Sequence, residues 1–523
     1  MCVLLLAAAW TLAAAQEPAV MRAALYLSGA ASEEEVPSEW IELVENSSSV
    51  RVNADRLRPG LLSDYQIASL ADYRASHGDI LSLEELALVD GFTAEAVAAL
   101  EPFLDLSSSR LPGNRDTVKV HGQLLLRGTL SAFGLKAKVQ GNGWRVGGAW
   151  RGKDWTAWGE ASGRWGRVVA GDMQLRSGQG LLLWTGFSMS SLSTVDAFVL
   201  HPTGITPCGS YASSGNRGLA YEYSGRKFRV SAFGTLGGLF GTRGEYMWRN
   251  GRLGATFVYE NQFCFSLDGH HNFRGADLAW EAAWKNRSPS GKASLRLPLG
   301  ERFRLALQAR ALPSRFSGKK YGEYALAVGG AFRTEGGSPP RHQASLTLDV
   351  SLLPIPGEDP RRFQLRAYGN WQWQLSPEWA LAVRFTERYR SYERSRTALR
   401  ADVHFVHGPW LSVARFEGVH CEKIGLLGYW EGGYKGSAAA GYFRVTGFGI
   451  PQWNDRIYTY ERDAPGSFSV PAYYGEGVAL SLVGNWKHRW RWFTLKLYGR
   501  GACMFRKEKD PSWTLNLQLQ AEF

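Results

Sequence analysis

The sequence predicts a mainly β protein, a large antiparallel transmembrane β-barrel preceded by a small all-α N-terminal domain. Two features carry this prediction: hydrophobicity alternates strictly with period two after about residue 116, and 19 of the 21 tryptophans follow that point. The 523 residues are 45% hydrophobic, too apolar for a disordered chain. No stretch beyond the first fifteen residues holds about 18 consecutive apolar residues, which excludes a helical membrane span.

The first fifteen residues, MCVLLLAAAWTLAAA, form a short apolar core that ends in small residues before Gln16. This pattern is typical of a secretory signal peptide over residues 1–15. We therefore expect the protein to be exported.

An acidic head is expected to follow. Residues 16–116 hold 7 basic and 18 acidic residues. Residues 117–523 hold 53 basic and 30 acidic residues. Residues 16–50 are predicted to form an acidic segment with a short helix over 33–45, and residues 51–106 a second helical unit. Residues 107–116 (SSSRLPGNRD) have the composition of a linker. Opposite net charges favour docking of the head onto the body that follows.

The alternation is clearest at the end of the chain, where apolar side chains occupy every odd position from Trp513 to Phe523 and polar ones every even position. The same pattern recurs over 362–373 and 302–310. A soluble sandwich also alternates, but about 400 residues of it would divide into several domains with visible linkers. Because no second linker is present, we predict one barrel over residues 117–523.

A strand and its connection take roughly 16 to 18 residues, so this length predicts roughly 22 to 26 strands, with aromatic girdles at the two membrane surfaces. Residues 178–216 break the alternation with a run rich in small residues. They are interpreted either as a constriction folded into the barrel or as a surface loop.

The last strand, WTLNLQLQAEF, ends in Phe523. It resembles the C-terminal assembly signal of outer-membrane barrels of Gram-negative bacteria. The resemblance implies location in the cell outer membrane, with outer-membrane lipid and the barrel-assembly machinery as partners. The N-terminal domain, which precedes the first strand, is then expected in the periplasm.

Two short motifs in the head repeat at an offset of 30 residues: Leu61, Leu62 and Ser63 followed by Ile67, and Gly91, Phe92 and Thr93 followed by Val97. Both resemble helix-hairpin-helix motifs, and the intervening YRASHGDILSLEEL resembles the connector of tandem modules in the competence DNA-receptor family. The chain is similar to exported helix-hairpin-helix proteins with a C-terminal outer-membrane barrel. Ser63 and Thr93 are expected to cap the following helices, with Gln66 completing a capping box.

The motifs depart from DNA-binding hairpins. Leu61 stands at the first glycine position, and Ser63 and Thr93 stand at the second. Between Asp55 and Asp105 three basic residues face ten acidic ones, so release of counterions from DNA cannot drive binding to that surface. We interpret the head as a degenerate tandem used for protein contacts or as scaffold, and DNA binding by the isolated head is disfavoured.

If the apolar face meets lipid, a set of arginines falls on the lumen side. A wall of this kind would favour anionic cargo. The alternatives are pairing with lumen acids such as Asp402 or with the acidic head, or placement in loops. The set comprises Arg302, Arg304, Arg310, Arg362, Arg366, Arg400 and Arg500.

No motif predicts an enzyme, a cofactor or a metal site. His270 and His271, with Asp268 and Asp277, are interpreted as a polar loop because a third correctly spaced ligand is lacking. GFSMS at 186–190 is not a nucleophile elbow, and phosphate and dinucleotide loops are absent. A surface hydrolase is thus disfavoured.

Function is expected at the outer membrane. The leading hypothesis is a channel or translocon component whose head gates the lumen or recruits a periplasmic protein partner. Uptake of DNA or another polyanion through an arginine-lined lumen is the first alternative, and a structural or assembly scaffold is the second.

Overall fold

The computed structural model describes residues 16–30, 33–47, 50–54, 57, 60–107, 120–185, 192–211, 216–225, 227–248, 250–273, 275–300, 302–334, 341–357, 362–465, 469–507 and 509–523. The expected signal peptide lies outside these residues, as do all but the first residue of the expected linker and the GFSMS run.

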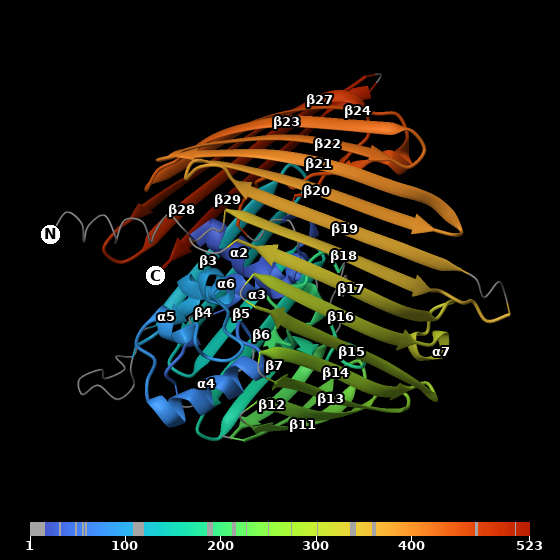
Figure 1. Ribbon diagram of the computed structural model, residues 1–523. Coiled ribbons are helices and arrows are strands. Elements are labelled where there is room, and N and C mark those ends of the chain that lie inside the picture. Colours follow the sequence, from blue (N-terminus) through green and yellow to red (C-terminus); the bar gives the residue numbers. More distant parts are fainter. Residues whose placement is uncertain are drawn as a thin grey trace.

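The body of the protein is a closed antiparallel barrel of 24 strands (Figure 1). The mainly β prediction and the expected range of strand number are confirmed. The strands are β3 (His121–Thr129), β4 (Phe133–Gly141), β5 (Trp144–Arg151), β6 (Asp154–Gly163), β7 (Gly166–Arg176), β9 (Arg217–Ser224), β10 (Phe228–Thr235), β11 (Phe240–Trp248), β12 (Gly251–Tyr259), β13 (Phe263–Phe273), β14 (Ala276–Lys285), β15 (Ser288–Leu299), β16 (Phe303–Leu312), β17 (Glu323–Arg333), β18 (His342–Leu352), β19 (Phe363–Gln374), β20 (Trp379–Arg390), β21 (Glu393–His407), β22 (Trp410–His420), β23 (Ile424–Lys435), β24 (Ala439–Ile450), β27 (Gly475–Arg489), β28 (Thr494–Arg506) and β29 (Lys509–Glu522).

The last strand closes the barrel on the first. β29 pairs with β3 in antiparallel register from Asn516 opposite Thr129 to Glu522 opposite Gln123. Beyond the strand end, Phe523 and Gly122 exchange two backbone hydrogen bonds of 2.7 and 3.0 Å. Closure gives the edge strands partners, as a sheet surrounded by lipid requires.

The two faces of the wall differ as the alternation predicts. In β29, Trp513 and Leu517 are 67% and 54% exposed on the outside, whereas Gln518 and Gln520 are buried on the inside. Apolar side chains therefore face outward along the barrel and polar ones face the lumen, the arrangement of a membrane-spanning barrel.

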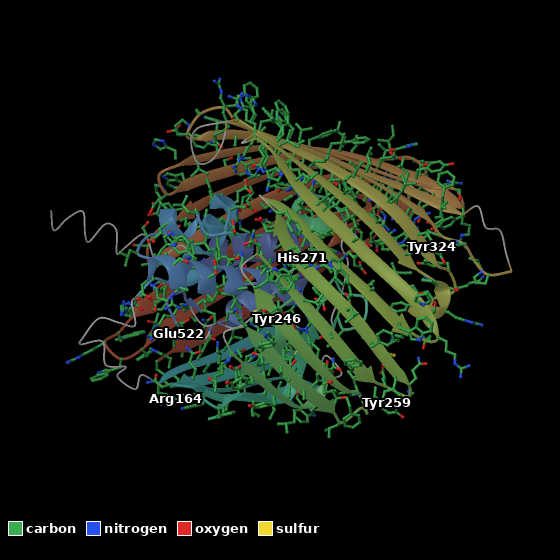
Figure 2. All side chains as sticks on the ribbon, turned by 60° about the horizontal axis from the view of Figure 1, so that its bottom comes forward. Arg164, Tyr246, Tyr259, His271, Tyr324 and Glu522 are labelled. Atoms are coloured by element: carbon green, nitrogen blue, oxygen red, sulfur yellow. The ribbon has the colours of Figure 1, made fainter. Side chains whose placement is uncertain are left out.

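Exposed aromatic side chains gather near both ends of the strands. Figure 2 shows Tyr259 and Tyr324 at one end of the barrel and Arg164 and Glu522 at the other. These two belts are the girdles expected at the membrane surfaces. One comprises Trp144, Trp165, Phe228, Tyr246, Phe273, Phe303, Trp379, Trp410 and Tyr434, and the other Phe133, Trp150, Trp155, Phe240, Tyr259, Phe263, Trp284, Tyr324, Phe363, Tyr389 and Trp513.

The connections distinguish the two ends of the barrel. At the end where β29 finishes, which we call the head end, most connections span two to four residues. At the opposite far end, two connections are much longer. We call them the first inward segment (177–216) and the second inward segment (451–474), because both fold into the lumen.

The head, residues 16–106, has its own apolar core. Its helices are α2 (Gln16–Ser28), α3 (Ser38–Asn46), α4 (Asp64–His77), α5 (Leu83–Leu86) and α6 (Ala94–Leu100), with 3₁₀ turns η1 (Glu33–Glu35) and η2 (Glu101–Phe103) and a parallel pair of β1 (Val50–Arg51) and β2 (Leu104–Asp105). None of the described helices is long and apolar enough to cross a bilayer. Leu62, Leu70, Ile80, Leu86 and Leu100 are fully buried together.

Two features of the head were predicted and one was missed. The Ser63 hydroxyl accepts the Gln66 N–H while the Gln66 side chain accepts the Ser63 N–H, which confirms the capping box, and Thr93 caps α6. Helix α2 was not predicted, although Ala19, Ala23 and Leu27 recur at helical spacing and are buried.

Candidate functional site: the occluded lumen

The head lies inside the barrel at the head end, surrounded by the wall (Figure 1). The Glu35 carboxylate is 3.2 Å from the Arg384 guanidinium of β20. At the rim, the Glu95 carboxylate is 3.2 Å from Arg304 of β16 and 3.0 Å from Arg333 of β17. Acidic side chains of the head thus form direct ion pairs with arginines of the barrel wall.

The first inward segment packs along one side of the wall. Its strand β8 (Gly204–Pro207) pairs with the last four residues of β7, Met173 to Arg176. The Glu281 carboxylate of β14 accepts the backbone N–H groups of Gln179 and Leu181 at 2.7 and 3.0 Å. This lumen carboxylate therefore fixes the start of the segment.

The middle of the first inward segment is held by a buried aromatic residue. Phe198, at the end of the 3₁₀ turn η3 (Asp196–Phe198), packs with Ala306 and Ala327, small residues on the lumen face. A Cβ at Gly329 would lie 3.0 Å from the Phe198 ring. The Gln308 amide donates to the Phe198 carbonyl at 2.7 Å. Small residues of the wall thus leave the space into which Phe198 of this segment packs.

The second inward segment fills the lumen on the other side. It contains the 3₁₀ turn η4 (Trp453–Asp455) and the short pair of β25 (Ile457–Tyr458) and β26 (Ala472–Tyr473). The Asp455 carboxylate accepts three consecutive backbone N–H groups, from Cys421 to Lys423, at 2.7 to 3.0 Å. These bonds lower the pKa of Asp455, although its burial acts in the opposite direction.

Acidic side chains of the second inward segment meet arginines of the wall. Glu461 forms an ion pair with Arg500 of β28, and the Asp463 carboxylate accepts the Asn516 amide at 2.8 Å. In the opposite sense, Arg462 of the segment reaches the Glu431 carboxylate of β23 at 2.7 Å. This segment was not predicted from the sequence, although Pro451, Pro465 and Pro471 mark a long interruption of the alternation.

The head also contacts the first inward segment directly. The Thr194 hydroxyl donates to the Gly29 carbonyl at 2.7 Å, and the Ser193 hydroxyl donates to the Glu35 carboxylate at 2.9 Å. Gly29 has φ +66°, and a Cβ there would lie 2.7 Å from the Ala197 Cα. The head and the first inward segment therefore pack directly against each other inside the lumen.

The apolar residues of the two hairpin loops are buried, whereas Ser63 and Gly91 are half-buried and Thr93 is exposed. Leu61, Leu62 and Phe92 are buried in the head core. Gly91, at φ +83°, presents its carbonyl to the Gln66 amide at 3.0 Å, which joins the two loops to each other. Leu61, Leu62 and Phe92 thus pack inside the head.

Contacts of the first loop and α4 extend to the surrounding protein. The Gly60 carbonyl lies 3.2 Å from His201 Nε2 of the first inward segment, and the Tyr65 ring stacks on His270 of β13 with centroids 4.5 Å apart. Burial lowers the pKa of His201 to about 4. Burial likewise raises the pKa of Tyr26, in α2, to about 12. Both groups are neutral near pH 7.

The predicted lumen arginines divide into two groups. Four of them face the lumen in ion pairs. Arg304 pairs with Glu95 and Asp196, and Arg310 pairs with Glu323 and Asp349. Arg400 pairs with Asp402, and Arg500 pairs with Glu461. Arg366 lies on the lumen face of β19, opposite Asp349 in register. Arg302 and Arg362 correct the prediction, since they lie in connections before β16 and β19, and Arg362 stacks 3.9 Å from the Tyr392 ring centroid.

A buried ion network that sequence reasoning did not find lies on the lumen face of β10 to β13. Arg243 joins Glu245 and Asp268 at 2.6 Å each, Arg252 joins Asp268 at 2.6 Å, and Arg229 joins Glu245 at 3.1 Å. All five side chains are nearly inaccessible to solvent. Three guanidinium groups therefore share two carboxylates beneath the first inward segment.

The interpretation of these residues as a polar loop is wrong, because Asp268, His270 and His271 lie within β13 and Asp277 is the second residue of β14. The His270 ring approaches Asp277, with Nε2 3.7 Å from the carboxylate. Among the described residues, no group of three or more His, Cys, Asp or Glu is placed to hold a metal ion.

The sequence matches no family model and no curated protein. Solved structures resemble the barrel. The chain is 8% identical to Pseudomonas aeruginosa OprD over 78% of this chain and 95% of that one, with a TM-score of 0.33. With the P pilus usher (PapC) translocation pore the identity is 9%, over 77% of this chain and 98% of that one, and the TM-score is 0.35. With the copper transporter OprC the identity is 8%, over 79% of this chain and 81% of that one, and the TM-score is 0.43. These similarities concern the barrel as a class of fold.

Proposed function

We propose that the protein is a channel or translocon component of the Gram-negative outer membrane, with its head on the periplasmic side as a gate. The apolar outer face and the two aromatic girdles support a membrane position. Short connections at the head end support a periplasmic placement of that end, because barrels of this kind have short periplasmic turns.

The observation that carries the gate is the pairing of head carboxylates with wall arginines. The acidic head and the basic barrel are joined by these ion pairs. Glu35 pairs with Arg384, and Glu95 pairs with Arg304 and Arg333. The Glu95 side chain is 38% exposed, so its two ion pairs are hydrated and individually weak. Release of the head requires these pairs to break together with its contacts to the first inward segment, whereas the pairing of the barrel strands does not depend on either set.

Single-channel conductance in planar bilayers tests this proposal. The full-length protein is compared with Glu35→Lys/Glu95→Lys, which places like charges against the wall. We expect the wild-type protein to pass little current and the double variant to open larger, more frequent steps. Glu84→Lys/Glu101→Lys is the matched control, since both residues are exposed on the head. Equal conductance in all three proteins contradicts a gating head.

For the head, we propose a degenerate helix-hairpin-helix tandem that serves protein contacts. The capped helices α4 and α6 and the loop contact between Gln66 and Gly91 support this assignment. The burial of Leu61, Leu62 and Phe92 in the head core argues against the alternative of DNA uptake. Tight binding of DNA by the full-length protein, or block of open steps by added DNA, would favour that alternative.

A scaffold role is the remaining alternative, and the same experiment addresses it. If the double variant releases the head, as judged by protease cleavage within residues 16–106, and yet stays silent in bilayers, then passage through the lumen is not its role. The barrel-assembly machinery and a periplasmic protein then become the partners to examine.

A further inference from the structure

A cavity of about 390 Å³ lies between the head and the wall beside the closing seam of the barrel. One side of it is apolar and comes mainly from the head. The other side comes from β3, β4, β28 and β29, with residues 460–465 of the second inward segment, and carries most of its charge. The apolar lining includes Val20, Ile41, Val44, Phe103, Leu125 and Trp158.

The wall side is cationic. Lys136 and Lys138 lie two residues apart on β4 and so share its lumen face, opposite Leu125 and Gln123 in register. Arg127 stands beside them on β3, where it donates to the Gln518 amide oxygen at 2.8 Å and to the Pro465 carbonyl at 2.5 Å. Both acceptors are neutral oxygens.

Three acidic residues also line the cavity. Glu522 accepts from Lys496 at 2.6 Å, and Asp463 accepts from Asn516 at 2.8 Å. Glu45 of the head is the third. The wall formed by β3 and β4 therefore presents positive charge toward the apolar surface of the head.

The cavity has an entrance at the head end. Gln123, Lys138 and Glu522 line both the cavity and an adjoining groove of about 430 Å³ at the rim. Arg489, Arg491 and Trp492 line the outer part of this groove. A small solute from the head-end compartment thus meets basic and aromatic side chains before it reaches Lys138.

We infer that this cavity is a binding site for a small organic acid, with an aliphatic body against the head and an anionic group at Lys136, Lys138 and Arg127. Its volume fits a small-molecule site, in which apolar walls take the body of a ligand and a few polar groups orient it. A charge-assisted bond to a carboxylate is stronger than a neutral one. The site needs no movement of the head, so this inference does not depend on gating.

Isothermal titration of the full-length protein in detergent micelles tests the site, with hexanoate as the probe and hexanamide as its neutral counterpart. Loss of two charge-assisted contacts in Lys136→Gln/Lys138→Gln should weaken hexanoate binding at least about tenfold. Lys153→Gln/Lys319→Gln, two exposed lysines outside the cavity, should leave binding unchanged. Glu45→Gln should strengthen it, because a negative charge leaves the cavity.

Three results would overturn the site: no binding of hexanoate, equal binding of hexanamide, or equal weakening by both lysine pairs. A heat-dependent shift of the folded barrel on gels verifies that each variant is folded. Conductance decides the gating proposal separately, so a silent channel with intact hexanoate binding leaves this inference standing.

Discussion

Glu35 of the head and Arg384 of β20 form an ion pair of 3.2 Å although 349 positions separate them in the chain. Arg384 also donates to the Asn370 side chain at 3.0 Å, and Glu35 accepts the Ser193 hydroxyl. Head, wall and first inward segment therefore meet at one point inside the lumen.

Reversal of this pair is expected to loosen the head. Arg384→Glu places two carboxylates together and should cost about 1 to 3 kcal/mol of docking free energy, the range for hydrogen bonds to charged groups. The rate of protease cleavage within residues 16–106 of the folded protein measures the loss. The exchange Glu35→Arg/Arg384→Glu restores opposite charges and should recover part of the protection. No recovery would assign the effect to lost packing.

Gly29→Ala is expected to separate the head from the first inward segment. Its backbone is at φ +66°, which costs an alanine about 1 kcal/mol, and the new Cβ would also overlap the Ala197 backbone. Gly318→Ala is the matched control, because Gly318 has φ +69° and a Cβ there would meet no atom within 4 Å. Faster cleavage of the head in Gly29→Ala alone identifies the contact as the cause.

Acidification is expected to destabilise the packed head through His201. Its folded pKa of about 4 lies below the ordinary value of 6.5, so between these values the unfolded chain binds more protons. Stability therefore rises with pH across this window and is lost as pH falls from about 6.5 to 4. Thermal unfolding at pH 7 and pH 5 measures the difference. His201→Gln should show a smaller difference, and an unchanged one would place the titrating group elsewhere.

The buried ion network of β10 to β13 should be costly to break. Glu245→Ala leaves Arg229, Arg243 and Arg252 with the single carboxylate of Asp268, and removal of one partner from a buried pair typically costs about 3 to 5 kcal/mol. The urea midpoint of the folded barrel on gels measures this loss. Glu378→Ala, which breaks an exposed pair with His407, should change the midpoint little. Equal small effects would show that the network contributes little.

The barrel was predictable because its signal is local. Trp513, Leu517 and Gln518 reveal by alternation alone which face meets lipid, and 24 repeats of that signal fix the class of fold. Helix α2 was missed because it directly follows the apolar run of residues 1–15 in the sequence, and its own buried positions are mostly alanines, which give a weak hydrophobic pattern.

The contents of the lumen were less predictable because they depend on contacts remote in sequence. Alternation placed Arg310 on the inner face, but its partners Glu323 and Asp349 come from β17 and β18, and strand register decides which acids it meets. The 178–216 run was recognised as irregular, yet its path depends on the seat that Ala306, Ala327 and Gly329 provide for Phe198. Single residues of a small type carry no signal of such a role.

The seam between β3 and β29 has a consequence for the order of folding. β3 is the first barrel strand to be synthesised, and its outer edge must wait for the final residues of the chain, down to Phe523, before it gains a partner. Until then a newly made chain carries an unsatisfied strand edge, the feature that most readily recruits other strands into aggregates. The pairing that ends this hazard joins strands almost 400 residues apart in the sequence, so we expect the β3 edge to need shielding until residues 516–523 have paired with it.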